Sequence, residues 1–339
     1  MIVLDSITIA VPSNLVEVTD SCFSHTFDSG NNLLRKVTKP NILGFNAIEV
    51  KPDITRIDVS AKIILEQYKD GININTIGRV LDTINATGII RLKSNTLTDY
   101  KVHKCDFVVN FHTDKPHQDY YNALNLIYNP RYTNAMYEKI SKNGFAFIGK
   151  QSGSNKYMKF YDKEKELYRS CNKPFVKIVG MPNLMNDFKD VIRIEYRAIT
   201  HEQIRGYSEI NSNNLDSLLR GVGNPLYKVF CEILRGNSIK PDDSALLGNI
   251  RTIQELDYML GNVGYTFWLN MFGNDLNNAL SPIRQMLKLS EKYKSSTSRK
   301  LKYYKEKFQQ LLSFEMATIS DNNVTDSIDE IKRFLLNNG

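Results

Sequence analysis

The sequence predicts an α+β protein: an open, antiparallel-rich sheet with helices on one face, followed by a helical domain. In the first two hundred residues, short segments alternate apolar and polar side chains, as half-buried strands do. Such strands suit a sheet whose second face stays in water. After about residue 213 only helical spacing remains. We therefore expect an α+β domain at 1–213, a basic helical domain at 214–318 and an acidic C-terminal tail at 319–339.

The composition is that of an ordinary globular protein with a basic balance. The chain has 339 residues, 42% of them hydrophobic and 24% charged, and a formal net charge of +7. A positive net charge favours a polyanionic partner. The four cysteines are widely spaced and form no CxxC pair, which favours reduced thiols in the cytoplasm. No apolar run reaches the roughly 20 residues of a membrane helix, so we expect no membrane partner.

Strand and helix signals can be placed along the chain before any chemistry is considered. Strands are expected at 7–11, 45–51, 56–62, 102–112, 144–149, 157–163 and 191–199, with 144–149 and 157–163 forming a hairpin. Helices are expected at 75–85 (ended by Gly88), from Lys163, and at 215–220, 226–235, 250–260 and 265–272. Pro282 is expected to precede a basic helix at 283–293, with another after Ser295, and Trp268 to lie in the core.

Three of the expected strands place charged or nucleophilic groups on the polar face of the sheet. Strand 102–112 contributes Asp106, and strand 191–199 contributes Glu195. The segment at 157–167 contributes Tyr161, which has lysines two residues before and after it. Because side chains two residues apart share one strand face, these groups would face the same side if the three strands are neighbours.

The segment Tyr161-Asp162-Lys163-Glu164-Lys165-Glu166-Leu167 resembles a motif of a known family. It is similar to the segment with the nicking tyrosine in replication initiators of the gene II/X family of filamentous phages, and in related trans-acting plasmid initiators. The family pattern is a strand ending in Tyr-x-Lys-x-x-Glu-Leu, followed by a strand of the form Arg-Ile-Glu-x-Arg. This chain has the second pattern at Arg193–Arg197.

Two further segments extend the resemblance to about residues 1–315. The family has an upstream strand with an Asp, often Arg-Ile-Asp-Val. Arg56-Ile57-Asp58-Val59 matches it literally, whereas His103–Val108 is looser but nearer the tyrosine, and both stay open. The basic stretch Ser296–Lys305 is similar to the family's terminal helix.

The resemblance implies a rolling-circle DNA replication initiator: a metal-dependent, site-specific single-strand endonuclease and strand transferase. Tyr161 would attack a DNA phosphodiester and become joined to the 5′ phosphate, leaving a free 3′ hydroxyl. Lys163 would lower the pKa of the phenol or hold the phosphate. Asp106, Glu195 and Glu166 would bind Mg²⁺ or Mn²⁺, which prefer oxygen ligands. No His-hydrophobic-His triplet occurs, which departs from rolling-circle nucleases that hold their metal with such a pair.

Other assignments stay open beside these. Tyr157 is the alternative nucleophile and Asp58 the alternative metal ligand. DNA contacts are expected from Lys159, Arg193, Arg197, Arg299, Lys300, Lys302, Tyr303 and Tyr304. The structural alternatives are that a strand tyrosine packs in the core, that Glu195 makes surface ion pairs, and that the basic run is a solvated helix face.

The expected partners are double-stranded and single-stranded origin DNA, a host helicase and a host DNA polymerase. The expected location is the cytoplasm, that of the host if a phage encodes the chain. One rival is a non-catalytic DNA-binding replication or copy-control protein on the same fold. Another is a mobilisation relaxase, which shares the chemistry and serves conjugation.

Overall fold

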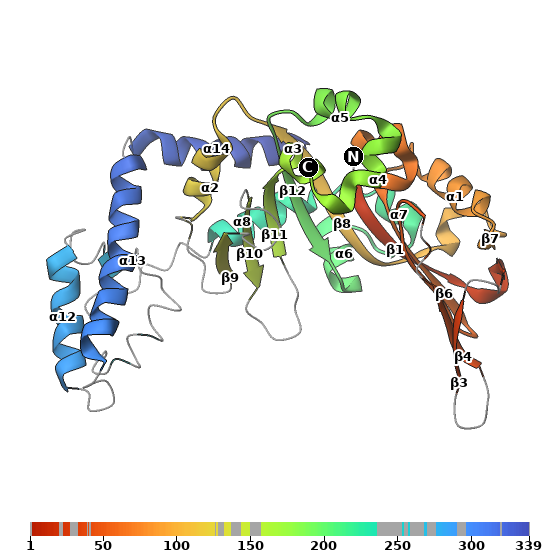
Figure 1. Ribbon diagram of the computed structural model, residues 1–339. Helices are drawn as coiled ribbons and strands as arrows, with labels where there is room; N and C mark the ends of the chain where they lie inside the picture. The colour runs from red at the N-terminus through yellow and green to blue at the C-terminus, as the bar shows by residue number, and fades with distance from the viewer. Residues whose placement is uncertain are drawn as a thin grey trace. The chain divides into compact units, whose positions relative to one another are not determined.

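The computed structural model describes 2–19, 23–27, 33–38, 40, 42–125, 127, 132–136, 144–149, 157–235, 253, 257, 268–269, 276–289, 296–318 and 321–338 (Figure 1). Two compact units can be separated. The first comprises Met1–His117, Ala135–Phe230 and Ile331–Gly339, and the second Gln118–Asn134 and Cys231–Glu330. Within the described residues, none of the helices has the length and hydropathy to span a bilayer.

A large antiparallel sheet, most of which lies in the first unit, confirms the predicted fold class. Ten strands follow the order β3-β4-β5-β6-β1-β8-β12-β11-β10-β9, and the pairings from β3 to β10 are antiparallel. Their bounds are β1 Leu4–Pro12, β3 Ser24–Phe27, β4 Leu33–Thr38, β5 Phe45–Val50, β6 Ile54–Ser60, β8 Lys101–His112, β9 Tyr132–Met136, β10 Gly144–Gly149, β11 Tyr157–Asp162 and β12 Val191–Ala198. Strands β3, β4 and β9 were not predicted from the sequence. Nor was a second small sheet, formed by β2 (Val16–Val18) and β7 (Ile90–Leu92).

Helices α6 (His201–Ser208), α7 (Leu215–Leu219) and α8 (Pro225–Arg235) follow β12 in the chain. The Tyr196 ring of β12 lies 5.4 Å from that of Tyr207 in α6, and the Phe160 ring of β11 lies 6.0 Å from that of Phe230 in α8. Helices α6 and α8 therefore pack against the apolar face of β11 and β12. Helix α7 and the first half of α8 follow the boundary expected at residue 213, yet they belong to the sheet unit.

Part of the polar face is also covered, contrary to the expectation that this face would stay open to water. A kinked 3₁₀ segment η3 (Ala61–Asp70) and helices α3 (Lys163–Leu167), α4 (Lys173–Val179) and α5 (Met181–Phe188) form this cover. The ring of Tyr68 in η3 packs edge-on against Phe175 of α4 at 4.8 Å and Phe188 of α5 at 5.7 Å. The predicted helix near 75–85 is α1 (Ile77–Ala86), and Gly88, with φ +70°, follows its end as expected.

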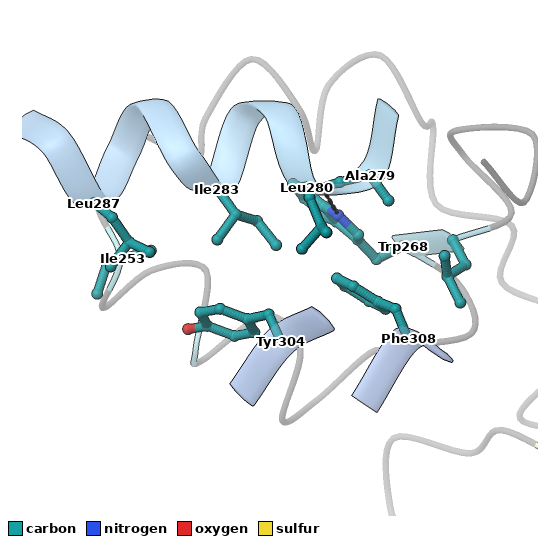
Figure 2. Packing of buried hydrophobic residues seen from close by; sticks show 9 residues of the cluster. Ile253, Trp268, Ala279, Leu280, Ile283, Leu287, Tyr304 and Phe308 are labelled. Atoms are coloured by element: carbon teal, nitrogen blue, oxygen red, sulfur yellow. Dashed lines mark hydrogen bonds between the residues drawn. The ribbon is translucent and has the colours of Figure 1, made fainter. Parts of the chain in front are cut away.

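The second unit has its own core between α12 (Leu276–Leu289) and α13 (Thr297–Thr318) (Figure 2). Trp268 is fully buried there, as predicted, and its indole Nε1 donates to Ala279 O at 2.9 Å. Pro282 lies inside α12, so the expectation that it precedes the helix is wrong. Because the predicted helices at 250–260 and 265–272 fall almost wholly outside the described residues, they stay predictions.

Helix α14 (Asp321–Asn338) occupies the region expected to be an acidic tail. Ile331 and Leu335 are buried, four residues apart and hence on one helix face. Another short helix that the sequence analysis missed is α2 (His117–Asn125). This region is therefore helical, and two of its apolar side chains are packed in the interior.

We predict that Gly44→Ala destabilises the protein much more than Gly88→Ala. Both glycines have positive φ (+83° and +70°), which costs an L-residue about 1–2 kcal/mol. An added Cβ at Gly44 would collide with the backbone nitrogen of Ile63, whereas at Gly88 it meets nothing within 4 Å. We expect a further cost of about 1–3 kcal/mol at Gly44. Urea unfolding of both variants measures the difference, and equal losses would contradict it.

Candidate active site on the polar face of the sheet

Strand β11 carries Tyr161 onto the polar face, where the sequence placed it. The strand alternates strictly, so that Phe160 is fully buried in the apolar layer while Tyr161 faces the other way and is half-buried. In the β11–β12 pairing, Tyr161 stands opposite Arg193 and Lys159 opposite Glu195. In the β12–β8 pairing, Arg197 stands opposite Asp106. Three neighbouring strands therefore contribute to one polar surface.

The hydroxyl of the predicted nucleophile, Tyr161, is hydrogen-bonded to Glu195. The Tyr161 hydroxyl donates to Glu195 Oε2 at 3.2 Å, and the Lys159 ammonium donates to Glu195 Oε1 at 3.2 Å. The Glu195 side chain is buried. Burial raises the pKa of Glu195, Lys159 opposes the rise, and the nearby Asp106 carboxylate adds to it. Glu195 is therefore placed to accept the phenolic proton.

The phenol itself is stabilised in its neutral form. Burial raises the pKa of Tyr161 well above its ordinary value, and the Glu195 carboxylate raises it further. We expected Lys163 to lower this pKa, but the Lys163 ammonium pairs with Glu166 Oε2 at 2.6 Å and lies 5.9 Å from the centre of the Tyr161 ring. Lys163 is also buried, and its burial lowers its own pKa. Lys163 is therefore a partner of Glu166, and these contacts do not support the expectation that it lowers the pKa of Tyr161.

Arg193 lies at the centre of a buried polar network and not in a DNA-binding surface. Its Nε donates to Asn110 Oδ1 at 2.9 Å, and its Nη1 donates to Asp5 Oδ1 at 2.6 Å and to Tyr68 Oη at 2.7 Å. The rings of Tyr68 and Phe188 lie 5.0 Å and 5.2 Å from its guanidinium carbon. With only 2% of its surface exposed, Arg193 is out of reach of DNA, and the predicted contact is corrected.

Asp106 is bound on both oxygens. Arg197 donates to it through Nε and Nη2 at 2.6 Å and 2.7 Å, and Ser6 Oγ donates at 2.7 Å. At a bulge in β1, two residues of β1 lie opposite one residue of β8. Asp5 and Ser6 therefore both reach the polar face. Tyr157, the alternative nucleophile, lies on the same face with Arg197 5.0 Å from its ring centre. Burial raises the pKa of Tyr157 to about 12.

The strand positions separate the two candidate upstream segments. Asp106 lies on β8, which pairs directly with β12. Asp58 lies on β6, which is four strands from β11 in the sheet order, or about 19 Å at the usual spacing of about 4.8 Å. Asp58 accepts from Asn46 Nδ2 at 2.8 Å and lies 3.8 Å from Lys104 Nζ. The looser match at His103–Val108 therefore lies on the nearer strand. Its Asp106 stands opposite Arg197, at the Tyr157 end of β11, whereas Tyr161 stands opposite Arg193 at the other end.

Each of the three predicted metal ligands is paired with a cation. Glu166 is bound by Lys163 and by Asn172 Nδ2 at 2.8 Å, whereas Asp106 and Glu195 are bound by Arg197 and Lys159. Burial acts to raise the pKa of Glu166, but the Lys163 ammonium outweighs it and lowers the value to about 2. Among the residues that the structure describes, no three His, Cys, Asp or Glu side chains form a metal-binding group. The predicted ligand set does not fit a three-carboxylate metal site.

The predicted DNA contacts of α13 differ in accessibility. Tyr304 is fully buried in the core of the second unit, and its hydroxyl donates to Asp257, so its predicted role in DNA binding is corrected (Figure 2). Tyr303 is 48% exposed, and Arg299 and Lys302 are also exposed. Lys300 pairs with Asp257 at 2.5 Å. Adjacent tyrosines point to different sides because each helical residue turns by about 100°.

Several residues of the site were not singled out from the sequence. Asp5 and Tyr68 reach Arg193 through a bulge and a kinked 3₁₀ segment, neither of which has a periodic signal. Small residues also escaped notice: Gly144 and Ala146 of β10 stand opposite Tyr161 and Lys159. A Cβ at Gly144 would lie 3.1 Å from Tyr161 Cβ, so the glycine keeps that side of the tyrosine clear. The sequence held one sign of this close approach, the glycine at the start of β10.

Comparisons with known proteins add no family to this geometry. No family model matches the chain. No curated protein matches it either.

We predict that Glu166→Gln destabilises the protein at neutral pH by about 3–5 kcal/mol, because it leaves the buried Lys163 ammonium without its carboxylate. Since the pKa of Glu166 is lowered to about 2, its ionised form stabilises the folded state. That contribution is complete above about pH 4.5 and is lost as the pH falls towards 2. The matched control is Glu164→Gln in the same helix, with an expected effect within about 0.5 kcal/mol.

Denaturant unfolding at a series of pH values measures both variants. The difference between wild type and Glu166→Gln should be large at pH 7 and should shrink as acid protonates Glu166. A difference that is independent of pH would contradict the assignment of Glu166 as an ionised partner of Lys163.

Proposed function

We propose that the chain is a rolling-circle DNA replication initiator, a site-specific nicking endonuclease and strand transferase that forms a 5′-phosphotyrosine link. The observation that carries the proposal is the 3.2 Å contact between the Tyr161 hydroxyl and the buried Glu195 carboxylate, on the polar face of three neighbouring strands. The resemblance of the segments at Tyr161–Leu167 and Arg193–Arg197 to the gene II/X family of filamentous phages supports the same activity.

In this proposal, Tyr161 is the nucleophile and Glu195 the general base. The Tyr161 oxygen forms a bond to the scissile phosphorus while its proton passes to Glu195, and the bond from phosphorus to the 3′ oxygen breaks. The leaving 3′ oxygen takes a proton from water. Since one ester replaces another, the enzyme retains the bond energy and can rejoin strands by the reverse step. A carboxylate with a raised pKa is a better base for this task.

The phosphate would be held by the cations at the accessible end of the polar face. The side chains of Lys159 and Arg197 are 15% and 30% exposed, whereas Lys163 and Arg193 are buried. Both accessible cations already pair with a carboxylate, so phosphate binding would exchange one anionic partner for another. Mg²⁺ or Mn²⁺ remains part of the proposal as an expectation from the family resemblance, and no step above passes through it.

DNA affinity in this proposal comes chiefly from exposed cations of the helical unit. Arg299 and Lys302 on α13 lie on its exposed surface beside Tyr303. Cations neutralise phosphates with a steep salt dependence, and an exposed tyrosine can stack on an unpaired base. The partners proposed are double-stranded and single-stranded origin DNA, with a host helicase and DNA polymerase acting at the free 3′ hydroxyl in the host cytoplasm.

A second candidate is a non-catalytic DNA-binding replication or copy-control protein on the same fold. The observation that favours it is the pairing of Asp106, Glu166 and Glu195 with Arg197, Lys163 and Lys159. Such a network can serve stability alone. The two candidates differ in one property, because only the first forms a covalent protein–DNA adduct.

We predict that the wild-type protein forms this adduct and that Tyr161→Phe abolishes it. The protein would be incubated with supercoiled DNA that carries its origin, with Mn²⁺, Mg²⁺ or chelator, and the open circles and the adduct would be measured. Tyr161→Phe removes one hydroxyl, so it should retain DNA binding. Tyr157→Phe is the matched control from the same strand face and should keep the adduct. Loss of the adduct in Tyr157→Phe but not in Tyr161→Phe would show that the nucleophile is misassigned.

We also predict that replacing Arg299, Lys300 and Lys302 together with Ala weakens DNA binding and flattens its salt dependence. Each phosphate that the variant no longer neutralises should reduce the slope of log K against log salt by about 0.9 for duplex DNA. The control is Lys332→Ala together with Arg333→Ala in α14, which removes two positive charges from a different helix. Binding titrations at several salt concentrations measure the slope, and an unchanged slope would remove this segment from the DNA interface.

A further inference from the structure

The ribbon of β3 and β4 ends the large sheet on the side away from β9 (Figure 1). Strand β3 pairs with β4 and is the last strand in the sheet order, so its other edge carries backbone groups that pair with none of the described strands. All four residues of β3 are exposed, although successive side chains of a strand point to opposite faces. Both faces of this strand are therefore open to solvent.

One face of β3 carries a pair of aromatic side chains that lie outside the core. His25 and Phe27 are two residues apart, and their rings lie 6.1 Å apart with an angle of 24° between their planes. Phe27 is 51% exposed, among the large hydrophobic residues that the described surface leaves in water. Lys36 of β4 stands directly opposite His25 in the register, so its side chain shares this face. Arg35 is its neighbour in the chain.

We propose that this ribbon binds single-stranded nucleic acid, with His25 and Phe27 stacking on unpaired bases and Lys36 placed towards the phosphates. Stacked aromatic rings beside a cation are the combination that sequence-tolerant single-strand binding uses, because every base has a π-face. The net charge of +7 favours any anionic partner, whether a nucleic acid or an acidic protein. The aromatic pair is therefore the observation that favours a nucleic acid. The identity of the strand as DNA rests on the proposed function.

An exposed edge strand can also take two other partners, which the chemistry of residue 27 distinguishes from a nucleic acid. A peptide or a second copy that extended the sheet would pair with the backbone edge and would gain from the apolar area of Phe27, whatever its π-character. A nucleobase requires the flat ring itself. The chemistry of residue 27 therefore distinguishes the partners, since leucine keeps apolar bulk but lacks the ring, and tyrosine keeps the ring.

The test measures the binding of a fluorescently labelled oligothymidine of about 20 nucleotides by anisotropy, in a Tyr161→Phe background that cannot cleave. We expect Phe27→Ala to weaken binding by about fivefold to 150-fold, the range for one base–aromatic stack. His25→Ala should weaken it as well. Phe27→Tyr should bind as the parent does, and Phe27→Leu as weakly as Phe27→Ala. Val222→Ala, which removes another exposed apolar side chain, is the control and should bind normally.

Three outcomes would overturn the proposal. The first is parental affinity for oligothymidine in the Phe27→Ala, His25→Ala double variant. The second is full affinity in Phe27→Leu, which would assign the face to apolar contact. The third is a dimer that sedimentation detects in the parent and not in Phe27→Ala, with unchanged oligothymidine binding. Because the assay needs no cleavage, a failure here is distinct from the absence of a Tyr161 adduct, and either result can occur without the other.

Discussion

The candidate site depends on the hydrogen bonds of the buried Arg193 guanidinium. A charge in the interior costs several kcal/mol unless hydrogen bonds and opposite charge compensate it. Here Asp5 of β1, Asn110 of β8 and Tyr68 of η3 supply that compensation, and Phe188 of α5 covers it. The pKa of Asp5 is lowered because Arg193, with Lys163 and Lys62, outweighs the effect of its burial. One side chain of β12 thus binds two neighbouring elements of the sheet to its helical cover, directly opposite Tyr161.

The electrostatics around this cation explain why Glu195 differs from the other carboxylates. Asp5 and Glu166 have lowered pKa values because strong cationic partners outweigh burial. Burial raises the pKa of Glu195, and repulsion from Asp106 and Asp5 adds to the rise, which its lysine partner opposes but does not cancel. A group that holds its proton more readily than its neighbours is the one best suited to receive a proton during a reaction. The site therefore has two parts: a structural network around Arg193 and a region around Glu195 that is suited to proton transfer.

Strand alternation made much of the fold and the central pair of the site predictable, whereas irregular backbone and helix rotation did not. The two-residue period placed Tyr161 and Glu195 on one face, and the structure places their side chains 3.2 Å apart. It could not show that Arg193 on that face is buried, because η3 and α5 that cover it have no strand signal. Local pattern also failed for Pro282, since a proline that reads as a helix start lies inside α12. Edge strand β3 has exposed residues on both faces, so it has no alternation to detect.

The position of the tyrosine within its strand has a mechanical consequence for any reaction there. Tyr161 precedes Asp162, which caps α3 by accepting from Lys165 N at 2.9 Å and lies 3.1 Å from His117 Nδ1. These contacts lower the pKa of Asp162 to about 2 against the effect of its burial, so the cap stays charged in ordinary conditions. The backbone after Tyr161 is therefore fixed by a charged cap and the backbone before it by pairing on both sides. In the proposed reaction the nucleophile must approach the phosphorus in line, and a displacement of about 1 Å lowers the rate. A tyrosine held rigidly in this way is therefore better suited to that reaction than a flexible surface tyrosine.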